Sequence, residues 1–163
     1  PNGGEATASG QGTAQEQTTT SEEQTKKPKR PKRPQTLTRA ELIAQGDAVC
    51  SKSQDKFKSY VKSTPGGEEE PNAAYSQLLV GISTNAVSEF RALEPPPGLR
   101  DEYDAYVKAQ EEVAGWDRDA LRAAKAGDAV AYAEARQTRD GTAAERQQLA
   151  EAVGFHVCSG SEA

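Results

Sequence analysis

The chain has 163 residues, of which 34% are hydrophobic, and its formal net charge is −5. This length allows one ordinary domain, and no apolar run approaches the ~20 residues that a membrane-spanning helix requires. An acidic chain is also a poor candidate for wrapping nucleic acid, because that binding depends on neutralising phosphates.

The first 36 residues contain no Val, Ile, Leu, Phe, Tyr or Trp. A segment without such side chains has little to bury, so it cannot offset the entropy of ordering its backbone, roughly 1 to 2 kcal/mol per residue. We therefore expect residues 1–36 to form a disordered linker and residues 37–163 to form one helical domain. The linker carries a charge of +2, which leaves −7 on the domain.

A basic, proline-rich run lies within this linker at residues 26–34, with the sequence KKPKRPKRP. Proline at every third position favours an extended polyproline-II conformation, which is stiffer than the Gly/Ser/Thr-rich stretch before it. We interpret the run as a solvated spacer with affinity for anionic cell-envelope polymers or lipids. An SH3-like groove and nucleic acid are the alternative partners.

The first helix is predicted over residues 38–62. Thr38 and Glu41 have the spacing of a capping box, in which each side chain accepts a hydrogen bond from the other residue's backbone amide. The segment 64–67, Thr-Pro-Gly-Gly, is expected to stop the helix. Its apolar positions recur at helical spacing: Leu42, Ile43, Val49, Cys50, Phe57, Tyr60 and Val61.

The second helix is expected to start at Pro71, a favoured first-turn residue, behind the acidic run at residues 68–70. The prolines of residues 94–98 should end it, because proline lacks an amide donor and clashes with the preceding turn. The predicted buried stripe is Tyr75, Leu78, Leu79, Ile82, Ala86, Phe90 and Leu93.

A third helix is predicted over residues 99–126, and Gly127 and Asp128 indicate a helix stop followed by an N-cap. The fourth helix, residues 129–153, has a polar centre at residues 138–142, where Gly141 marks either a kink or a break. The apolar stripe of the third helix is Leu99, Tyr103, Tyr106, Val107, Val113, Ala114, Ala120 and Leu121, with Trp116 at its edge. Apolar positions in the fourth are Ala131, Ala135, Leu149, Ala152 and Val153.

Four helices with short connections predict an all-α, up-down-up-down four-helix bundle. In that topology the beginning of the first helix and the end of the fourth lie at the same end, which favours a disulfide between Cys50 and Cys158. Two free thiols or a metal pair are the alternatives, although the wide spacing is unlike a Cys-x-x-Cys motif. Closing so long a loop is expected to stabilise the fold by about 2 to 5 kcal/mol.

No pattern in the sequence predicts a catalytic residue, a metal site or a cofactor. His156, the single histidine, is expected to be a surface or capping residue, with a metal or haem ligand as the alternative. The paired carboxylates are typical of the solvated face of a helix. The aromatic residues Tyr103, Tyr106, Trp116 and Tyr132 are expected to be core residues, or else to line a small-ligand pocket between helices.

Four segments occur in a recognisable order: LIAQGDAVC at residues 42–50, LEPPP at 93–97, AGD at 126–128 and VGFHVC at 153–158. Over residues 37–160 the chain resembles a group of small secreted proteins and lipoproteins of actinobacteria whose function is unknown. The resemblance implies export, a lipid-anchored cysteine upstream of Pro1 and a helical bundle with paired cysteines, but no activity. The polar centre of the fourth helix departs from the usual pattern and puts the continuity of that helix in doubt.

These observations lead to two functional hypotheses. The chain contains no Met, so a start at Pro1 indicates a processed terminus, and removal of an export signal is the simplest explanation. We therefore expect an extracytoplasmic protein at the cell surface or secreted. The first hypothesis is a non-enzymatic binding or structural module tethered to the cell envelope, and the alternative is a small-ligand carrier with a pocket between helices.

Overall fold

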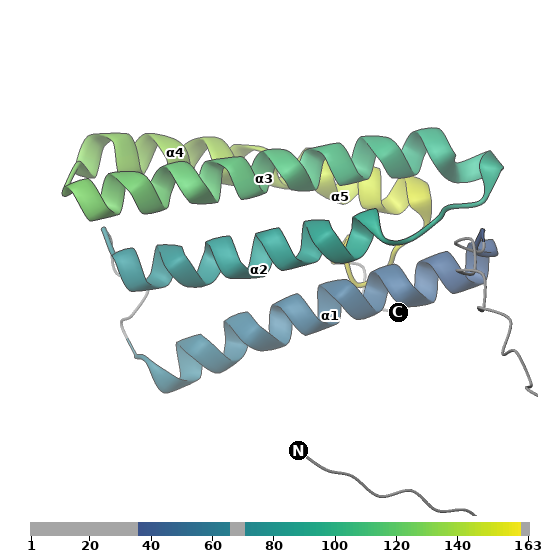
Figure 1. Ribbon diagram of the computed structural model, residues 1–163, viewed down its shortest axis with the longest axis horizontal. Helices are drawn as coiled ribbons and strands as arrows, with labels where there is room; N and C mark the ends of the chain where they lie inside the picture. The colour runs from purple at the N-terminus through teal and green to yellow at the C-terminus, as the bar shows by residue number, and fades with distance from the viewer. Residues whose placement is uncertain (1–35, 66–70, 161–163) are drawn as a thin grey trace, which may run out of the picture. The chain divides into compact units, whose positions relative to one another are not determined.

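The fold comes from a computed structural model that describes residues 36–65 and 71–160 (Figure 1). The helices are α1 (Arg39–Ser63), α2 (Ala73–Arg91), α3 (Arg100–Ala126), α4 (Ala129–Gly141) and α5 (Ala143–Val153), with a 3₁₀ turn, η1, at Pro97–Leu99. These described ranges contain no strand, which confirms the all-helical fold class. The predicted linker, except Thr36, and the acidic run at residues 68–70 lie outside the described residues.

The helix α3 is the central element of the domain. It packs against α2 on one side and against α4 and α5 on the other, while α1 packs mainly against α2 (Figure 1). Within the described helices, no segment combines the length and the apolar character that crossing a bilayer would require.

The predicted start of α1 is confirmed. The Thr38 hydroxyl accepts a hydrogen bond from the Glu41 amide at 3.3 Å, and the Glu41 carboxylate accepts one from the Thr38 amide at 2.8 Å. This capping box satisfies backbone donors that the first turn of a helix leaves unpaired. The bonds from Thr38 also lower the pKa of the Glu41 carboxyl, because they favour its charged form.

The predicted start of α2 at Pro71 is wrong, because the helix begins at Ala73. Asn72 is its N-cap: the side-chain oxygen accepts hydrogen bonds from the amides of Ala74 and Tyr75 at 2.9 and 3.0 Å. An asparagine that caps two amides defines the first turn more strongly than a proline that only suits it.

The boundary between α3 and α4 agrees with the sequence. Gly127 has a φ of 71°, in the left-handed region that favours glycine, and it ends α3. The Asp128 side chain then accepts a hydrogen bond from the Ala131 amide at 3.0 Å and caps α4.

The predicted fourth helix is divided into α4 and α5 at Thr142, beside Gly141. The Thr142 hydroxyl donates to the Arg139 carbonyl at 2.7 Å, and the Thr142 amide donates to the same carbonyl at 3.3 Å. The hydrogen bond from the Thr142 amide spans three residues, whereas hydrogen bonds in an α-helix span four. The helix is therefore tightened and interrupted at this point. The polar centre noted in the sequence is therefore a break between two helices.

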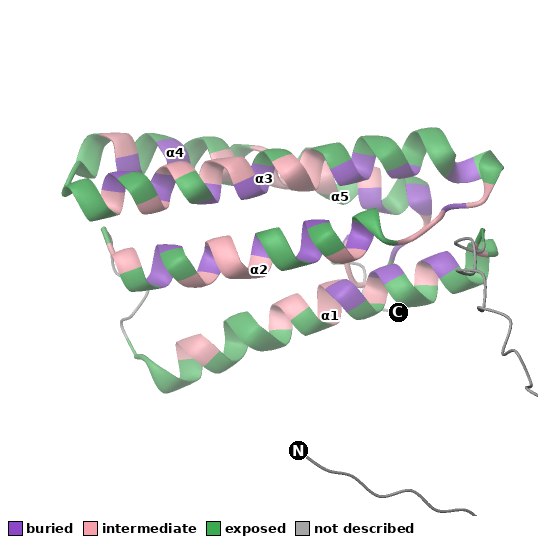
Figure 2. Cartoon of the chain, viewed as in Figure 1, coloured by how far each residue is buried: buried purple, intermediate pink, exposed green. Residues whose placement is uncertain are grey.

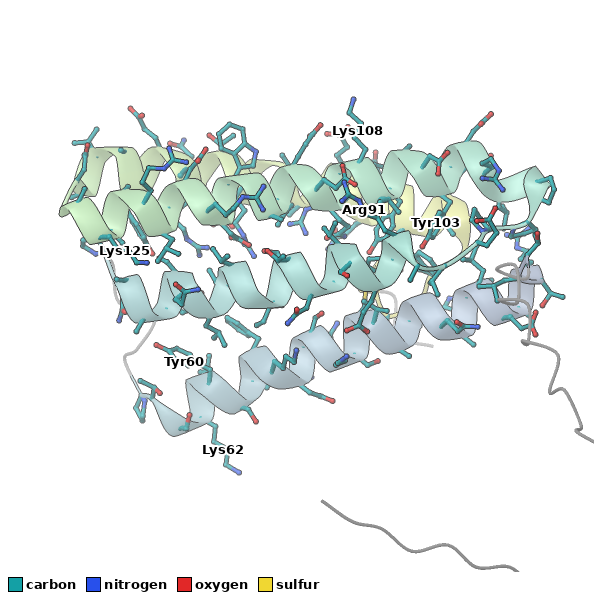
Figure 3. All side chains as sticks on the ribbon, viewed as in Figure 1. Tyr60, Lys62, Arg91, Tyr103, Lys108 and Lys125 are labelled. Carbon is teal, nitrogen blue, oxygen red and sulfur yellow. A yellow bond between two sulfur atoms is a disulfide. The ribbon has the colours of Figure 1, made fainter. Side chains whose placement is uncertain are left out.

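The main core, whose buried positions are purple in Figure 2, contains an aromatic centre beside α3. The Phe155 ring lies 5.3 Å from the Tyr106 ring and 6.1 Å from the Phe90 ring, measured between centroids. The Tyr103 hydroxyl donates a hydrogen bond to the Phe90 carbonyl at 2.6 Å, so its polar atom is satisfied inside the core (Figure 3). A second, smaller cluster joins α3 to α4 and consists of Ala120, Ala123, Tyr132 and Ala135.

Burial on α1 is confined to its first half (Figure 2). The buried residues are Leu42, Gly46 and Val49, whereas Phe57, which belongs to the same apolar stripe, is 37% exposed. The helical spacing of the stripe therefore does not mean that it is buried along its whole length. The second half has apolar residues at helical spacing but no neighbour that covers them completely.

Residues 154–160, called here the C-terminal segment, pack onto the buried half of α1. The predicted disulfide between Cys50 and Cys158 is confirmed, with an S–S distance of 2.07 Å. One turn earlier, the Asp47 carboxylate accepts hydrogen bonds from the backbone amides of His156 and Val157 at 3.0 and 2.9 Å. The segment is thus attached to α1 by one covalent bond and by charge-assisted hydrogen bonds.

Gly46 allows the C-terminal segment to approach α1 this closely. A Cβ atom at this position would lie 2.3 Å from Cε1 and 2.5 Å from Cζ of the Phe155 ring. The ring is 1% exposed and belongs to the main core, so it has little room to move. A glycine in the middle of a helix normally destabilises the helix slightly. Here the close contact with Phe155 requires it.

Replacing Asp47 should destabilise the oxidised protein. Asp47→Ala leaves the amides of His156 and Val157 without their acceptor, and we expect the free energy of unfolding to fall by about 2 to 4 kcal/mol. Denaturant titration of the oxidised variant measures this. Asp55→Ala, at an exposed position on the same helix, should change the value by less than about 0.5 kcal/mol. Equal effects of the two substitutions would contradict the role of Asp47.

Two glycine substitutions should have opposite effects. Gly46→Ala should lower the free energy of unfolding by about 1 to 3 kcal/mol, because the new methyl group overlaps Phe155. Gly81→Ala, in α2, should raise it by about 0.5 to 1 kcal/mol, because nothing lies within 4 Å of the added Cβ and alanine is the better helix former. Thermal and denaturant unfolding measure both. A neutral Gly46→Ala variant would rule out the close contact as the reason for this glycine.

Candidate ligand-binding site

A cleft of about 510 Å³ is bordered by residues from α1 to α5 and by the C-terminal segment. Its volume lies within the range of small-molecule sites, roughly 300 to 1,000 Å³. One end is formed by the disulfide between Cys50 and Cys158 together with Val157. The cleft therefore starts where the C-terminal segment stops covering α1.

The apolar part of the cleft comes mainly from α2 and α3 and includes Leu79, Ile82, Phe90 and Val113. Towards the exposed half of α1 it is bordered by aromatic rings. The Tyr75 ring lies 6.3 Å from the Phe57 ring and 5.9 Å from the Tyr60 ring, measured between centroids. Tyr75 and Phe57 line the cleft, so a ligand there would meet aromatic as well as aliphatic surface.

The opposite wall is cationic. Arg136 and Arg139 of α4 and Arg146 of α5 all line the cleft, and Lys58 of α1 contributes a fourth positive charge. Arg136 and Arg139 are three residues apart on one face of α4, and Arg146 reaches the same cleft from α5, beyond the break. Among the described residues that line the cleft, none is acidic. This local excess of positive charge lies within a chain whose net charge is −5.

Two of these arginines contact other side chains of the domain through ion pairs or a cation–π contact. The Arg139 Nε lies 2.7 Å from the carboxylate of Asp117, which is 1% exposed, and its Nη1 donates to Asp140 at 2.9 Å. The Arg136 guanidinium lies over the Tyr75 ring, with its carbon 5.5 Å from the ring centroid, a cation–π contact. Both side chains are thus held in place at the wall of the cleft.

Arg146 differs from these two. Its Nε is buried and has no hydrogen-bond partner among the described residues, and it takes part in none of the ion pairs found there. Burial, together with the positive charge of Arg139, lowers the pKa of Arg146, and the negative charges of Asp117 and Asp140 offset this only in part. Burial also raises the pKa of the Tyr106 phenol, which lines the same cleft. On balance, the environment around Arg146 therefore disfavours its positive charge.

The aromatic residues considered from the sequence are placed differently from one another. Tyr106 is buried in the main core and also lines the cleft, whereas Tyr103 and Tyr132 are buried in the two core clusters and do not line it. Trp116 borders a separate depression formed by α3 and α4, with Asp119 and Arg122. The sequence thus indicated that aromatic rings could line a pocket, but only one of the four named residues lines this cleft.

His156 is exposed, and its backbone amide is bonded to Asp47. In the described part of the chain, no group of three or more His, Cys, Asp or Glu residues is arranged to hold a metal ion.

The cationic wall was missed in the sequence. Residues 138–142 stood out only as a polar interruption of the fourth helix, and the arginines were not connected with one another. The spacing of Arg136 and Arg139 on one face was a usable signal, because like charges on one face of a helix repel unless something compensates them. What the spacing alone does not reveal is that this face borders a cleft and not open solvent.

The buried pair between Asp117 and Arg139 should be necessary for stability. Asp117→Asn leaves a largely buried guanidinium with only the exposed carboxylate of Asp140 as its partner, and we expect a loss of about 3 kcal/mol in the free energy of unfolding. The control is Asp119→Asn, whose carboxylate forms an exposed pair with Arg122 and should contribute less than about 1 kcal/mol. Denaturant titration compares them, and similar losses would show that burial of the first pair is unimportant.

Searches for similar proteins found no match to this chain. No protein-family model, curated protein or solved structure is significantly similar to it. The cleft is therefore the feature that bears on function, and its two outstanding properties are an apolar floor and a wall of arginines.

Proposed function

We propose that this protein is a non-enzymatic binding module that holds a small ligand in the cleft bordered by its helices. The observation that carries the proposal is the cleft of about 510 Å³, which combines apolar surface with a few convergent polar groups. Ligand sites in proteins usually have this composition, and helical bundles build them between facing helices. Of the two hypotheses drawn from the sequence, the carrier is the one that this geometry favours.

The module is proposed to be extracytoplasmic. The disulfide between Cys50 and Cys158 supports this location, because stable disulfides are typical of oxidising compartments. The proposal also includes a lipid anchor upstream of Pro1. For the domain, it includes an up-down-up-down order of four helices, with α4 and α5 counted as one. The order is supported by the short connections between successive helices that pack together.

The linker of residues 1–36 is proposed to hold the domain away from the membrane or wall. The basic run at residues 26–34 supports contact with anionic envelope polymers or lipids through electrostatic attraction. Such attraction depends on charge and not on a defined site, so salt should weaken it. A purely structural module is the competing reading, and it gives no reason for a cleft in the domain.

Blocking the cleft should remove a bound small molecule. Ser53 lines the cleft from α1 and is half-buried, so Ser53→Trp would fill it with an indole ring. Native mass spectrometry of the full chain, purified gently from its own host, should reveal a small-molecule adduct on the wild type that is absent from this variant.

The matched control is Ser59→Trp, at an exposed position on the same helix that does not line this cleft. This variant should keep the adduct. Loss of the adduct from both variants, or its retention by Ser53→Trp, would place the ligand elsewhere. A wild-type protein that never carries a small molecule would count against the carrier function itself.

A further inference from the structure

The proposed function leaves the class of ligand open, and the following inference rests on that function. We infer that the ligand is an anionic amphiphile with a single alkyl chain, whose head contacts Arg146 and whose chain lies along the apolar floor. The inference uses three properties of the cleft: the sign of its charge, the unsatisfied donor of Arg146 and the apolar surface beside it.

The charge of the cleft selects an anion. Four positive side chains line it, and its described lining contains no carboxylate. Burying charge in a region of low dielectric is unfavourable unless an opposite charge is close. Asp117 and Asp140 form ion pairs with Arg139; they also attract Arg146, but no ion pair among the described residues includes Arg146. A ligand with a negative head would supply the missing charge, whereas a cation would add to the repulsion.

Arg146 is the best placed donor for that head. Its Nε is buried and has no hydrogen-bond partner among the described residues. A guanidinium presents several N–H donors in one plane, which matches the geometry of carboxylates and phosphates. A partner for a buried donor gives a larger gain than one more bond to an exposed group, because the unsatisfied donor is itself a cost.

The apolar floor requires more than a simple anion. Leu79, Ile82 and Val113 line the cleft, and Phe57, beside them, is one of the few large apolar side chains exposed in the described part of the chain. Leu79 and Val113 are themselves almost fully buried, so the apolar surface open to a ligand comes mainly from Phe57 and the partly buried Ile82. A phosphate or acetate ion would leave that surface in contact with water. An alkyl chain would cover it and gain roughly 0.8 kcal/mol for each CH₂ group buried.

The experiment compares three probes on the full-length, oxidised protein by isothermal titration calorimetry, each below its critical micelle concentration. Dodecanoate has both the chain and the negative head, dodecyltrimethylammonium has the same chain with a positive head, and acetate has the head without the chain. We expect dodecanoate to bind, and both other probes to bind at least about tenfold more weakly.

A pair of arginine variants then tests the role of Arg146. Arg146→Gln should weaken dodecanoate binding by about tenfold or more, because it removes a charge-assisted hydrogen bond. Arg118→Gln is the control, since Arg118 is exposed on α3 and does not line the cleft. Ser53→Trp provides a second test that leaves Arg146 intact, and it should abolish dodecanoate binding if the chain occupies the cleft.

The outcomes distinguish this inference from the function on which it rests. Equal affinities for dodecanoate and dodecyltrimethylammonium, or tight dodecanoate binding by Arg146→Gln or Ser53→Trp, would overturn the anionic amphiphile. If the host-derived adduct is still lost in Ser53→Trp, the cleft remains a binding site for another class of ligand. If neither an adduct nor dodecanoate binding is found, both the inference and the proposed function fail.

Discussion

The attachment of the C-terminal segment to α1 is the constraint on which the rest of the domain depends. The helix α1 buries only three residues, all in its first half, so its own packing contributes little to its attachment to the bundle. The disulfide of Cys50 and Cys158 limits the unfolded chain, while the bonds from His156 and Val157 to Asp47 orient the segment. The disulfide acts on the unfolded chain and the hydrogen bonds to Asp47 act on the folded chain, so neither replaces the other.

The cleft is a consequence of where that attachment lies. The C-terminal segment contacts α1 as far as Gln54, whose side chain donates to the Val157 carbonyl, and beyond this point Phe57 is partly exposed. The floor of the cleft belongs to α2 and α3, and its cationic wall to α4 and α5. A domain whose helices were all buried along their length would leave no such space, so the partial burial of α1 is the structural basis for the proposed ligand site.

The break between α4 and α5 lies within the cationic wall of the cleft. Arg139 lies before the break and Arg146 after it, and both reach the cleft. The Thr142 hydroxyl bonded to the Arg139 carbonyl ties the geometry of the break to the same arginine. A polar stretch that looks unsuited to a helix in the sequence is thus the part of the domain that concentrates positive charge beside an apolar surface.

The sequence by itself determined the all-helical class, the capping of α1 and α4, the stop at Gly127 and the disulfide. Capping and glycine stops depend on neighbouring residues, and the disulfide followed from the expected order of the helices. Only the tertiary structure decided that Gly46 must admit Phe155, that Phe57 stays partly exposed, and that Arg146 borders a cleft. These features depend on which surfaces distant segments present to each other, and helical periodicity marks a face without identifying what covers it.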